Sequence, residues 1–260
     1  MTASIGDVRR MEESGFNVLQ SRRQLFYDGW LLFLSPGTAK RARSVNAHFG
    51  STLPVAQKIA RCEALYAAQG LTPLFRITPC SAPDDLDARL AALGYVSFDT
   101  TLVQACALAP ALPLAAGAAP SLDGLETSSP LPEAFVEAVG TMRGSTATQR
   151  GAHLERLAQT PLNLIPLLVR REGVTVAAGM ACVEGDLAGF FDIVVLPALR
   201  RRGLGTLVLG GLLARAWERG GREGFLQVTQ GNGDALSIYR RFGFATRYTY
   251  HYRARPEHVE

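Results

Sequence analysis

The sequence predicts an α/β protein (α+β, with a mixed sheet) built from two modules that repeat one order of elements. Its 260 residues suit two compact units, because typical domains contain about 100 to 150 residues. Strand-like runs of Val, Ile and Leu alternate with helical periods in both halves. A Pro- and Ala-rich segment between the halves cannot continue as one helix. We therefore expect modules at 1–108 and 125–260, joined by a linker at 109–124.

The N-terminal half contains one clear run of helix, strand and helix. Apolar spacing predicts a helix over Val55–Ala68, closed by Gly70, and a strand over Leu74–Thr78. A second helix is expected at Asp84–Leu93, where Gly94 closes it. This is the shorter of the two repeats.

The C-terminal half predicts a longer succession of elements. Three apolar strands form an antiparallel meander, followed by a helix, a short buried strand, a second helix and a strand with alternating tyrosines. Their ranges are Leu164–Arg170, Val174–Val183, Leu187–Val195, Gly203–Arg219, Phe225–Thr229, Asp234–Phe242 (closed by Gly243) and the strand with Tyr248, Tyr250 and Tyr252. The two halves align with LFRIT on FLQVT and Leu93-Gly94-Tyr95 on Phe242-Gly243-Phe244.

The composition narrows the class of ligand and compartment. The chain is 47% hydrophobic, and its net charge of +4 is spread along the sequence, which favours a small anionic ligand over nucleic acid. The four cysteines, Cys62, Cys80, Cys106 and Cys182, are far apart, so we expect reduced core thiols and no metal site. No signal-like or membrane-spanning apolar run occurs. A cytoplasmic protein with no nucleic-acid or membrane partner is expected.

A basic glycine loop, Arg200-Arg201-Arg202-Gly203-Leu204-Gly205-Thr206, stands between an apolar strand and a helix. The first turn of a helix offers unpaired N–H groups, and glycines let an anion approach the backbone. Val208 stands where a dinucleotide fingerprint needs its third glycine, and the Gly-Lys-Ser/Thr of a P-loop is absent from the loop. Taken alone, the motif fits a solvated helix start as well as a diphosphate site.

The surrounding residues resolve that choice through a family resemblance. FDIVVLPALRRRGLGTLVLGGLLARAWERG followed by LQVTQGNGDALSIYRRFGF resembles the GNAT superfamily of acyl-CoA-dependent N-acyltransferases over about fifty residues. The resemblance implies that a splayed strand end bonds the pantetheine of acetyl-CoA, while the glycine loop holds its pyrophosphate. The implied cofactor contacts are Ile193, Val194, Val195, Arg200, Arg201, Arg202, Gly203, Leu204, Gly205, Thr206 and Asn232.

The second helix supplies the implied catalytic residue. Asn232 and Tyr239 are seven residues apart and share one helix face, with Ala235 between them. Under the resemblance, Ala235 leaves room for the cofactor and Tyr239 is the general acid that protonates the leaving CoA thiolate. Considered alone, Tyr239 would be a core aromatic and Asn232 a helix N-cap, and the cap and cofactor roles can coexist.

The general base is not assigned by the sequence. Some relatives place a Glu on the fifth strand, where this chain has Gln227, which accepts no proton usefully. Asp192 precedes the cofactor strand end, but strand alternation is expected to turn it away from the site. A structural role for Asp192 is the better prediction.

The first module is expected to be degenerate. Pro83 and Leu90 align with Asn232 and Tyr239, and no basic glycine loop precedes its first helix. Trp30, Arg41–Asn46 and Arg76 could roof the acceptor pocket, although core or exposed roles are the simpler expectation. We therefore predict an N-acetyltransferase with one cofactor site and a small-molecule or peptide amine acceptor, as a monomer or homodimer, with residues 120–260 alone able to bind cofactor. The alternative is a non-catalytic acyl-CoA sensor or regulatory protein.

Overall fold

A computed structural model of the chain describes residues 3–37, 39–109, 125–129 and 131–259. Its strands form a single mixed sheet of 11 strands in the order β1-β2-β3-β4-β11-β5-β10-β9-β8-β7-β6. The strands are β1 (Gln24–Tyr27), β2 (Trp30–Phe33), β3 (Ser44–Asn46), β4 (Leu74–Ile77), β5 (Val96–Ala107), β6 (Leu125–Ser128), β7 (Leu164–Arg171), β8 (Val174–Glu184), β9 (Leu187–Val195), β10 (Glu223–Thr229) and β11 (Ala245–Ala254). This confirms the predicted α/β class with a mixed sheet.

Three of the described helices have recognisable capping residues at one end. Ser4 and Asp7 form a capping box at the start of α1, Thr146 and Gln149 form another at α6, and Gly144 ends α5 in a left-handed conformation. The helices are α1 (Ile5–Val18), α2 (Val55–Ala67), α3 (Leu86–Ala92), α5 (Pro132–Arg143), α6 (Ala147–Gln159), α7 (Leu204–Glu218) and α8 (Gly233–Arg241), with short 3-10 turns η1 (Lys40–Arg43), η2 (Pro197–Leu199) and η3 (Pro256–His258).

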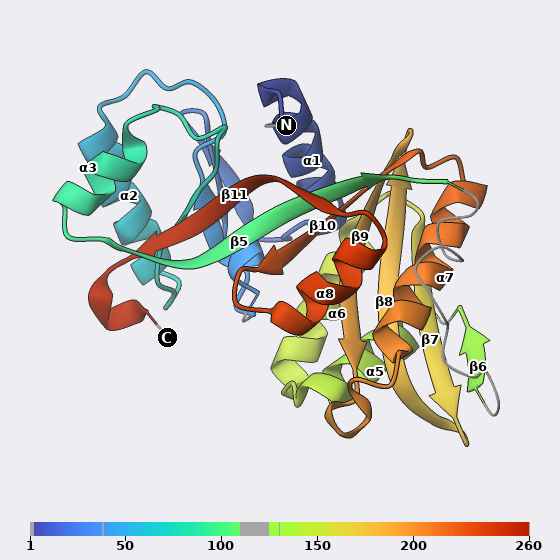
Figure 1. Cartoon of the computed structure of the whole chain (residues 1–260). Helices are drawn as coiled ribbons and strands as arrows, with labels where there is room; N and C mark the ends of the chain where they lie inside the picture. The colour runs from blue at the N-terminus through green and yellow to red at the C-terminus, as the bar shows by residue number, and fades with distance from the viewer. Residues whose placement is uncertain (1–2, 38, 110–124, 130, 260) are drawn as a thin grey trace.

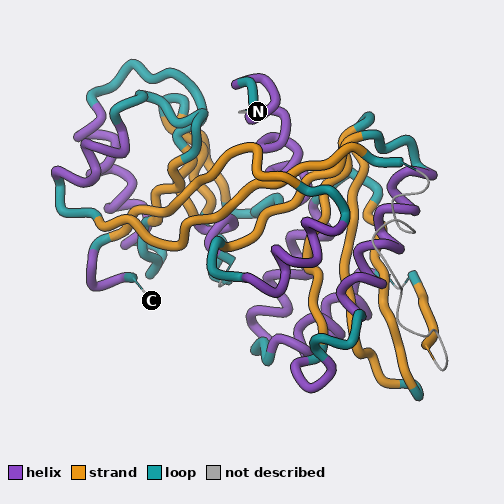
Figure 2. Tube along the Cα trace, viewed as in Figure 1, coloured by secondary structure: helices purple, strands orange, loops and turns teal. Residues whose placement is uncertain are grey.

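The two halves of the chain exchange their last strands. Strand β5, from the N-terminal half, lies between β10 and β11 of the C-terminal half, and β11 lies between β5 and β4. The β10–β5 pairing runs from Glu223 opposite Ala107 to Thr229 opposite Thr101. Figure 1 shows β5 and β11 side by side across the middle of the molecule, and the strands in Figure 2 continue from one half into the other. Each half therefore completes the sheet of the other.

The predicted internal repeat is visible in the hydrogen bonds. β3 pairs with β4 in parallel in the first half, as β9 pairs with β10 in the second. After each second helix a glycine has positive φ, +85° at Gly94 and +79° at Gly243. The next amide then turns back onto the helix, from Tyr95 N to Leu90 O at 3.0 Å and from Phe244 N to Tyr239 O at 3.1 Å. Leu90 is thus the equivalent of Tyr239.

Apolar side chains pack on both faces of the C-terminal sheet. Helices α7 and α8 cover one face of β7–β10, and α1, α5 and α6 cover the other. A separate core joins α2 and α3 to β2–β4. The α1 helix crosses from the first half to pack under the second, so the core, like the sheet, is shared.

Three features of the described residues bear on the expectations from composition. All four cysteines are buried and free. None of the described helices is long and apolar enough to cross a bilayer. Within the described ranges, no group of three or more His, Cys, Asp or Glu side chains could hold a metal ion. Residues 110–124 of the predicted linker lie outside the described residues.

Candidate active site

A bulge in β9 opens the sheet at the predicted cofactor strand. The β9–β10 pairing runs from Leu187 to Phe190 and ends there. On the other side of β9 the register slips, because Asp192 adopts a positive φ of 54°. Gly179 faces this slip, and a Cβ there would lie 2.7 Å from Val208 of α7. The end of β9 therefore diverges from β10 and leaves the sheet open between them.

An open cavity of about 440 Å³ lies between the divergent strand end, the start of α7 and helix α8. We call it the α7–α8 cavity. It is lined by Ile193, Val194, Val195, Arg200, Arg201, Gly203, Leu204, Gly205, Thr206, Asn232, Asp234, Ala235, Ser237, Ile238, Tyr239 and Arg241. Every residue predicted for the site is included except Arg202, which is exposed and does not line it because the chain reverses at Gly203.

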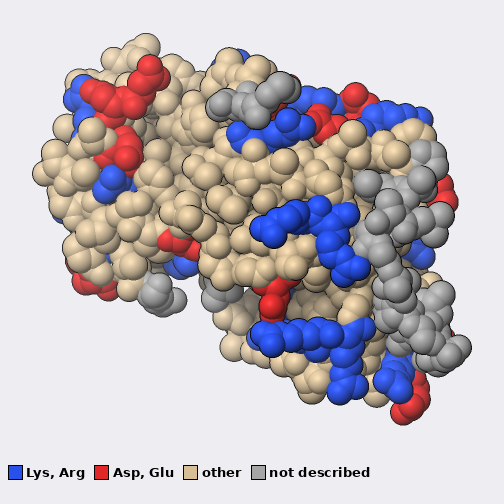
Figure 3. All heavy atoms as spheres, viewed as in Figure 1, with Lys and Arg blue, Asp and Glu red and all other residues tan. Residues whose placement is uncertain are grey.

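The start of α7 is arranged to receive an anion. Its N-cap, Gly203, has a φ of +78° and makes no side-chain cap. The first bond into the helix runs from Leu207 N to Gly203 O at 3.0 Å, which leaves the amides of Leu204, Gly205 and Thr206 without intrahelical acceptors. Basic side chains gather over α8 and over the connection that leads into α7 (Figure 3). The cavity thus combines free amides, a helix dipole and positive charge.

Arg241 is a lining residue that the sequence did not predict, and Gly205 has a second role besides the predicted one. Arg241 lines the cavity from α8, and its spacing of seven residues from Asp234 on one helix face was the available signal. Gly205 also serves packing, because a Cβ there would lie 2.9 Å from Ile238 Cδ1 of α8. The glycine therefore lets α7 and α8 approach each other, besides leaving the cavity open.

Asn232 and Tyr239 hold the two ends of one face of α8. The Asn232 side chain accepts from Ala235 N at 3.2 Å, so it is the N-cap that the sequence allowed. Tyr239 is buried, and burial raises the pKa of its phenol to about 12. The phenol is therefore protonated throughout the neutral range, as a proton donor must be.

A second cavity of about 440 Å³ adjoins the first and shares Ile193, Asn232 and Tyr239 with it. We call it the inter-half cavity, because both halves of the chain line it. It is lined by Ala39, Lys40, Arg41, Asp99, Thr101, Arg143, Phe190, Phe191, Asp192, Ile193, Gln227, Val228, Thr229, Asn232, Tyr239, Tyr250 and Tyr252. Tyr239 thus stands where two cavities meet.

Asp192 faces the inter-half cavity, so the expectation that strand alternation turns it away is wrong. The bulge at Asp192 itself breaks the alternation. Its carboxylate pairs with Arg143 at 2.8 Å and His153 at 2.9 Å. Burial alone would raise the pKa of Asp192, but Arg143 and His153 outweigh burial and hold it well below its usual range. This carboxylate is a structural anchor and a poor base.

The side-chain oxygen of Gln227, the residue at the expected base position, is engaged by two donors. Its Oε1 accepts from Arg41 Nη1 at 2.8 Å and from the Tyr250 hydroxyl at 2.9 Å. Of the residues considered as a pocket roof, Arg41 lines the inter-half cavity, whereas Trp30 and Arg76 are buried.

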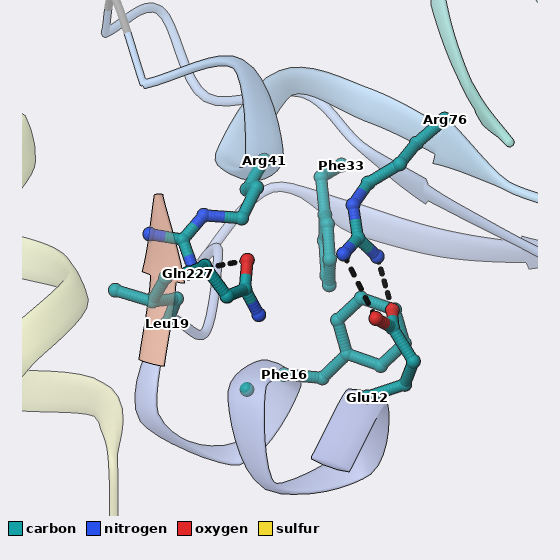
Figure 4. A pocket seen from close by; sticks show the side chains of 8 residues that line it. Glu12, Phe16, Leu19, Phe33, Arg41, Arg76 and Gln227 are labelled. Carbon is teal, nitrogen blue, oxygen red and sulfur yellow. Dashed lines mark hydrogen bonds and ion pairs between the residues drawn. The ribbon is translucent and has the colours of Figure 1, made fainter. Parts of the chain in front are cut away.

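A small cavity beneath Gln227 contains an ion pair that crosses between elements. Figure 4 shows the Arg76 guanidinium facing the Glu12 carboxylate of α1, beside Arg41 and Gln227. The Tyr248 hydroxyl also donates to Glu12 at 2.6 Å, and the guanidinium lies 3.7 Å over the ring of Tyr250. Arg76 is therefore a core residue, as the simpler expectation had it.

A family comparison decides the identity of the second half. The model of the acetyltransferase (GNAT) family matches residues 135–244. The C-terminal region is a GNAT acetyltransferase domain. An uncharacterized N-acetyltransferase, YobR, of Bacillus subtilis (strain 168) is 28% identical over 252 residues, covering 95% of this chain and 98% of the relative. The streptothricin acetyltransferase of Streptomyces lavendulae is 37% identical over 76 residues, which cover 24% of this chain and 40% of the relative.

Solved structures share the fold of most of the chain. A GCN5-related N-acetyltransferase from Kribbella flavida superposes with a TM-score of 0.70 at 19% identity over 95% of both chains. A tandem GNAT protein from the clavulanic acid biosynthesis pathway gives a TM-score of 0.61 at 17% identity, covering 81% of this chain and 74% of the other. These similarities extend beyond the matched GNAT residues and are consistent with a fold of two modules.

Proposed function

We propose that this protein transfers an acetyl group from acetyl-CoA to a primary amine, with the reaction at Tyr239. The observation that supports this most is the meeting of the α7–α8 cavity and the inter-half cavity at Tyr239, Ile193 and Asn232. A sensor that binds acyl-CoA without turnover would need only the first cavity. The second gives an amine a route to the same atoms.

Acetyl-CoA would bind along the α7–α8 cavity. The open edge of β9 at Ile193–Val195 can pair with the amides of pantetheine as a further strand would. The amides at the start of α7 face the pyrophosphate, and Arg200, Arg201 and Arg241 add positive charge at the same cavity. Asn232 can offer its NH2 group to the cofactor, because its oxygen is engaged in the helix cap.

The chemical step needs one proton donor at the sulfur. The amine nitrogen attacks the thioester carbonyl and a C–N bond forms. As the C–S bond breaks, the phenol of Tyr239 donates its proton to the leaving thiolate, and the proton that the acylated nitrogen loses returns through water to the phenolate. The desolvation that raises the pKa of Tyr239 to about 12 acts equally on a thiolate in the same cavity, so donor and acceptor remain matched.

The amine has to arrive neutral. For a lysine-like amine, with a pKa of about 10.4, deprotonation at pH 7 costs about 4.6 kcal/mol. Asp192 is paired and Gln227 is neutral, so neither takes this proton. We propose that it leaves through water in the inter-half cavity, which is open to solvent.

The two modules act as one folded unit in this proposal. The units proposed at 1–108 and 125–260 share the sheet through β5 and β11. The first half supplies Lys40, Arg41 and Asp99 to the inter-half cavity. It therefore shapes the acceptor side while the GNAT domain holds the cofactor.

Ala235 offers a clean test of the cofactor site. Ala235→Glu puts a carboxylate into the α7–α8 cavity three residues after the N-cap Asn232, where an acidic side chain suits the positive end of the helix dipole and the helix is retained. Calorimetry should show acetyl-CoA binding lost in Ala235→Glu and weakened far less in Ala235→Gln, which matches its size without the charge. Equal affinity in wild type and Ala235→Glu would remove this cavity from the proposal. CoA release from wild type with a panel of amines then tests turnover.

A further inference from the structure

The charges of the inter-half cavity are paired with one exception. Lys40 Nζ meets Asp99 at 2.9 Å, and Arg143 meets Asp192 at 2.8 Å. Among the residues that the structure describes, no carboxylate lies within ion-pair distance of Arg41. This guanidinium lines the cavity and is partly buried. It is a cation without a counter-ion at the wall of a site that must admit a substrate.

The neighbours of Arg41 position it without neutralising it. Gln227 Oε1 accepts from Arg41 Nη1 at 2.8 Å (Figure 4). The same oxygen accepts from the Tyr250 hydroxyl at 2.9 Å. A carboxylate at position 227 would have closed an ion pair with Arg41. The amide instead orients the guanidinium and leaves its charge and its other N–H donors for a further acceptor.

The protein around the cavity adds positive potential. Arg156 of α6 is buried, donates to the Ala152 carbonyl at 2.9 Å and meets no carboxylate within the described ranges. Burial lowers the pKa of Arg156, and the nearby charge of Arg41 lowers it further, although Asp192 acts in the opposite direction. A carboxylate or phosphate entering here would be attracted, and a polycation would be repelled.

We infer that the acceptor is an amine that carries a carboxylate or phosphate group, and that Arg41 binds this anion. The inference rests on the proposed acetyl transfer. The amine would face the thioester beside Tyr239, while the anion meets Arg41 of the first half. Guanidinium groups bind planar oxyanions through two hydrogen bonds, so Arg41 selects the substrate by geometry as well as by charge. Polyamines and aminoglycosides fit this site poorly.

Matched pairs of amines test the inference without requiring turnover. With the protein saturated by CoA, calorimetry compares O-phosphoethanolamine with ethanolamine, β-alanine with β-alaninamide, and L-lysine with L-lysinamide. The anionic member of at least one pair should bind about tenfold tighter or more than its neutral partner. Arg41→Gln should abolish that preference, and Arg41→Lys should keep part of it. Both variants should bind acetyl-CoA as wild type does, because Arg41 does not line the α7–α8 cavity.

Arg43 is the matched control. It lies on the same turn, η1, and outside the lining of the inter-half cavity, so Arg43→Gln removes one positive charge without changing the preference. Equal binding of both members of every pair, no binding of any anionic amine, or a preference that survives in Arg41→Gln would each overturn the inference. Failure to bind acetyl-CoA would instead refute the proposed function, whatever the amines do.

Discussion

The starts of α2 and α7 are equivalent positions in the two halves, and what lies ahead of each helix differs. Just ahead of α2, the Asp28 carboxylate accepts from Leu53 N at 2.9 Å, Thr52 N at 3.0 Å and Thr52 Oγ1 at 2.8 Å. The bond from Leu53 is the largest of the influences that hold the pKa of Asp28 well below its usual range. At α7 the cap is Gly203, and a cavity stands in front of the helix. In the first half a carboxylate of the protein binds the loop ahead of the helix, where the second half has an open cavity.

The same contrast recurs at the second helix of each half. Leu90 is fully buried in the core of the first half, whereas Tyr239 reaches both cavities of the second. The comparison teaches that a repeated module can lack the chemistry of its partner while its order of elements and its packing remain. What remains of the first half is packing, a shared strand and one wall of the substrate site.

Removing the first half gives the largest expected effect. The sequence alone predicts that residues 120–260 bind cofactor, but the sheet order predicts that residues 125–260 do not fold. Without β5, strand β10 loses a partner along its whole length and β11 loses a neighbour. We expect no cooperative thermal transition and no acetyl-CoA binding for this fragment. Co-expression with residues 1–109 should restore both, and a fragment that melts cooperatively on its own would show that the exchange is dispensable.

Breaking the buried ion pair between α1 and β4 should be the next largest effect. Glu12 and Arg76 have side-chain exposures of 1% and 2%. Arg76→Met leaves Glu12 without its counter-ion, which should cost about 3–5 kcal/mol of unfolding free energy. Urea unfolding measures this, and the double variant Arg76→Met with Glu12→Gln should recover much of the loss. A single variant as stable as wild type would contradict the role of this pair.

The pH dependence of stability follows from the same pair. Burial raises the pKa of Glu12, but Arg76 and the Tyr248 hydroxyl outweigh burial and hold it below its usual value. The pair therefore stabilises the fold fully above the unfolded pKa of about 4.3, and this contribution is lost as pH falls through the lower folded pKa. Urea unfolding as a function of pH should show a flatter acid limb in Glu12→Gln than in wild type. If stability falls equally steeply with acid in wild type and Glu12→Gln, Glu12 does not determine the pH dependence of stability.

Equivalent positions in the two halves should separate chemistry from stability. Tyr239→Phe should lower kcat by about 10² or more, with acetyl-CoA affinity within a few-fold of wild type. Leu90→Ala should instead cost about 2–5 kcal/mol of stability and leave the kcat of the folded protein unchanged. Single-turnover kinetics and urea unfolding make both measurements. A Tyr239→Phe variant with wild-type single-turnover rate would remove Tyr239 as the acid.

The sequence could predict what depends on local pattern. The meander and the helices α7 and α8 follow from periodicity and turn glycines, and most of the lining of the α7–α8 cavity was expected from the family resemblance. Strands β1 to β3 were missed because three or four residues carry too little alternation. The predicted orientation of Asp192 was wrong, because the alternation of residues along a strand does not reveal where a bulge interrupts it. The sequence could not predict the exchange of β5 and β11, the binding of the loop before α2 by Asp28, or the unpaired charge of Arg41. All three depend on contacts between segments far apart in the chain.

The smallest expected effect concerns the number of acetyl-CoA molecules bound per chain, which should not change when Asp28 is replaced. Native mass spectrometry at saturating acetyl-CoA should find one cofactor per chain, and still one in Asp28→Ala. Removing that carboxylate frees the amides ahead of α2, but β3 stays paired with β4 through Asn46, its last residue, so the strands do not diverge as β9 and β10 do. Pro83 also lacks an amide side chain to meet pantetheine. A second cofactor in Asp28→Ala would mean that Asp28 alone keeps the first half empty, and a second in wild type would mean that both halves retain the site.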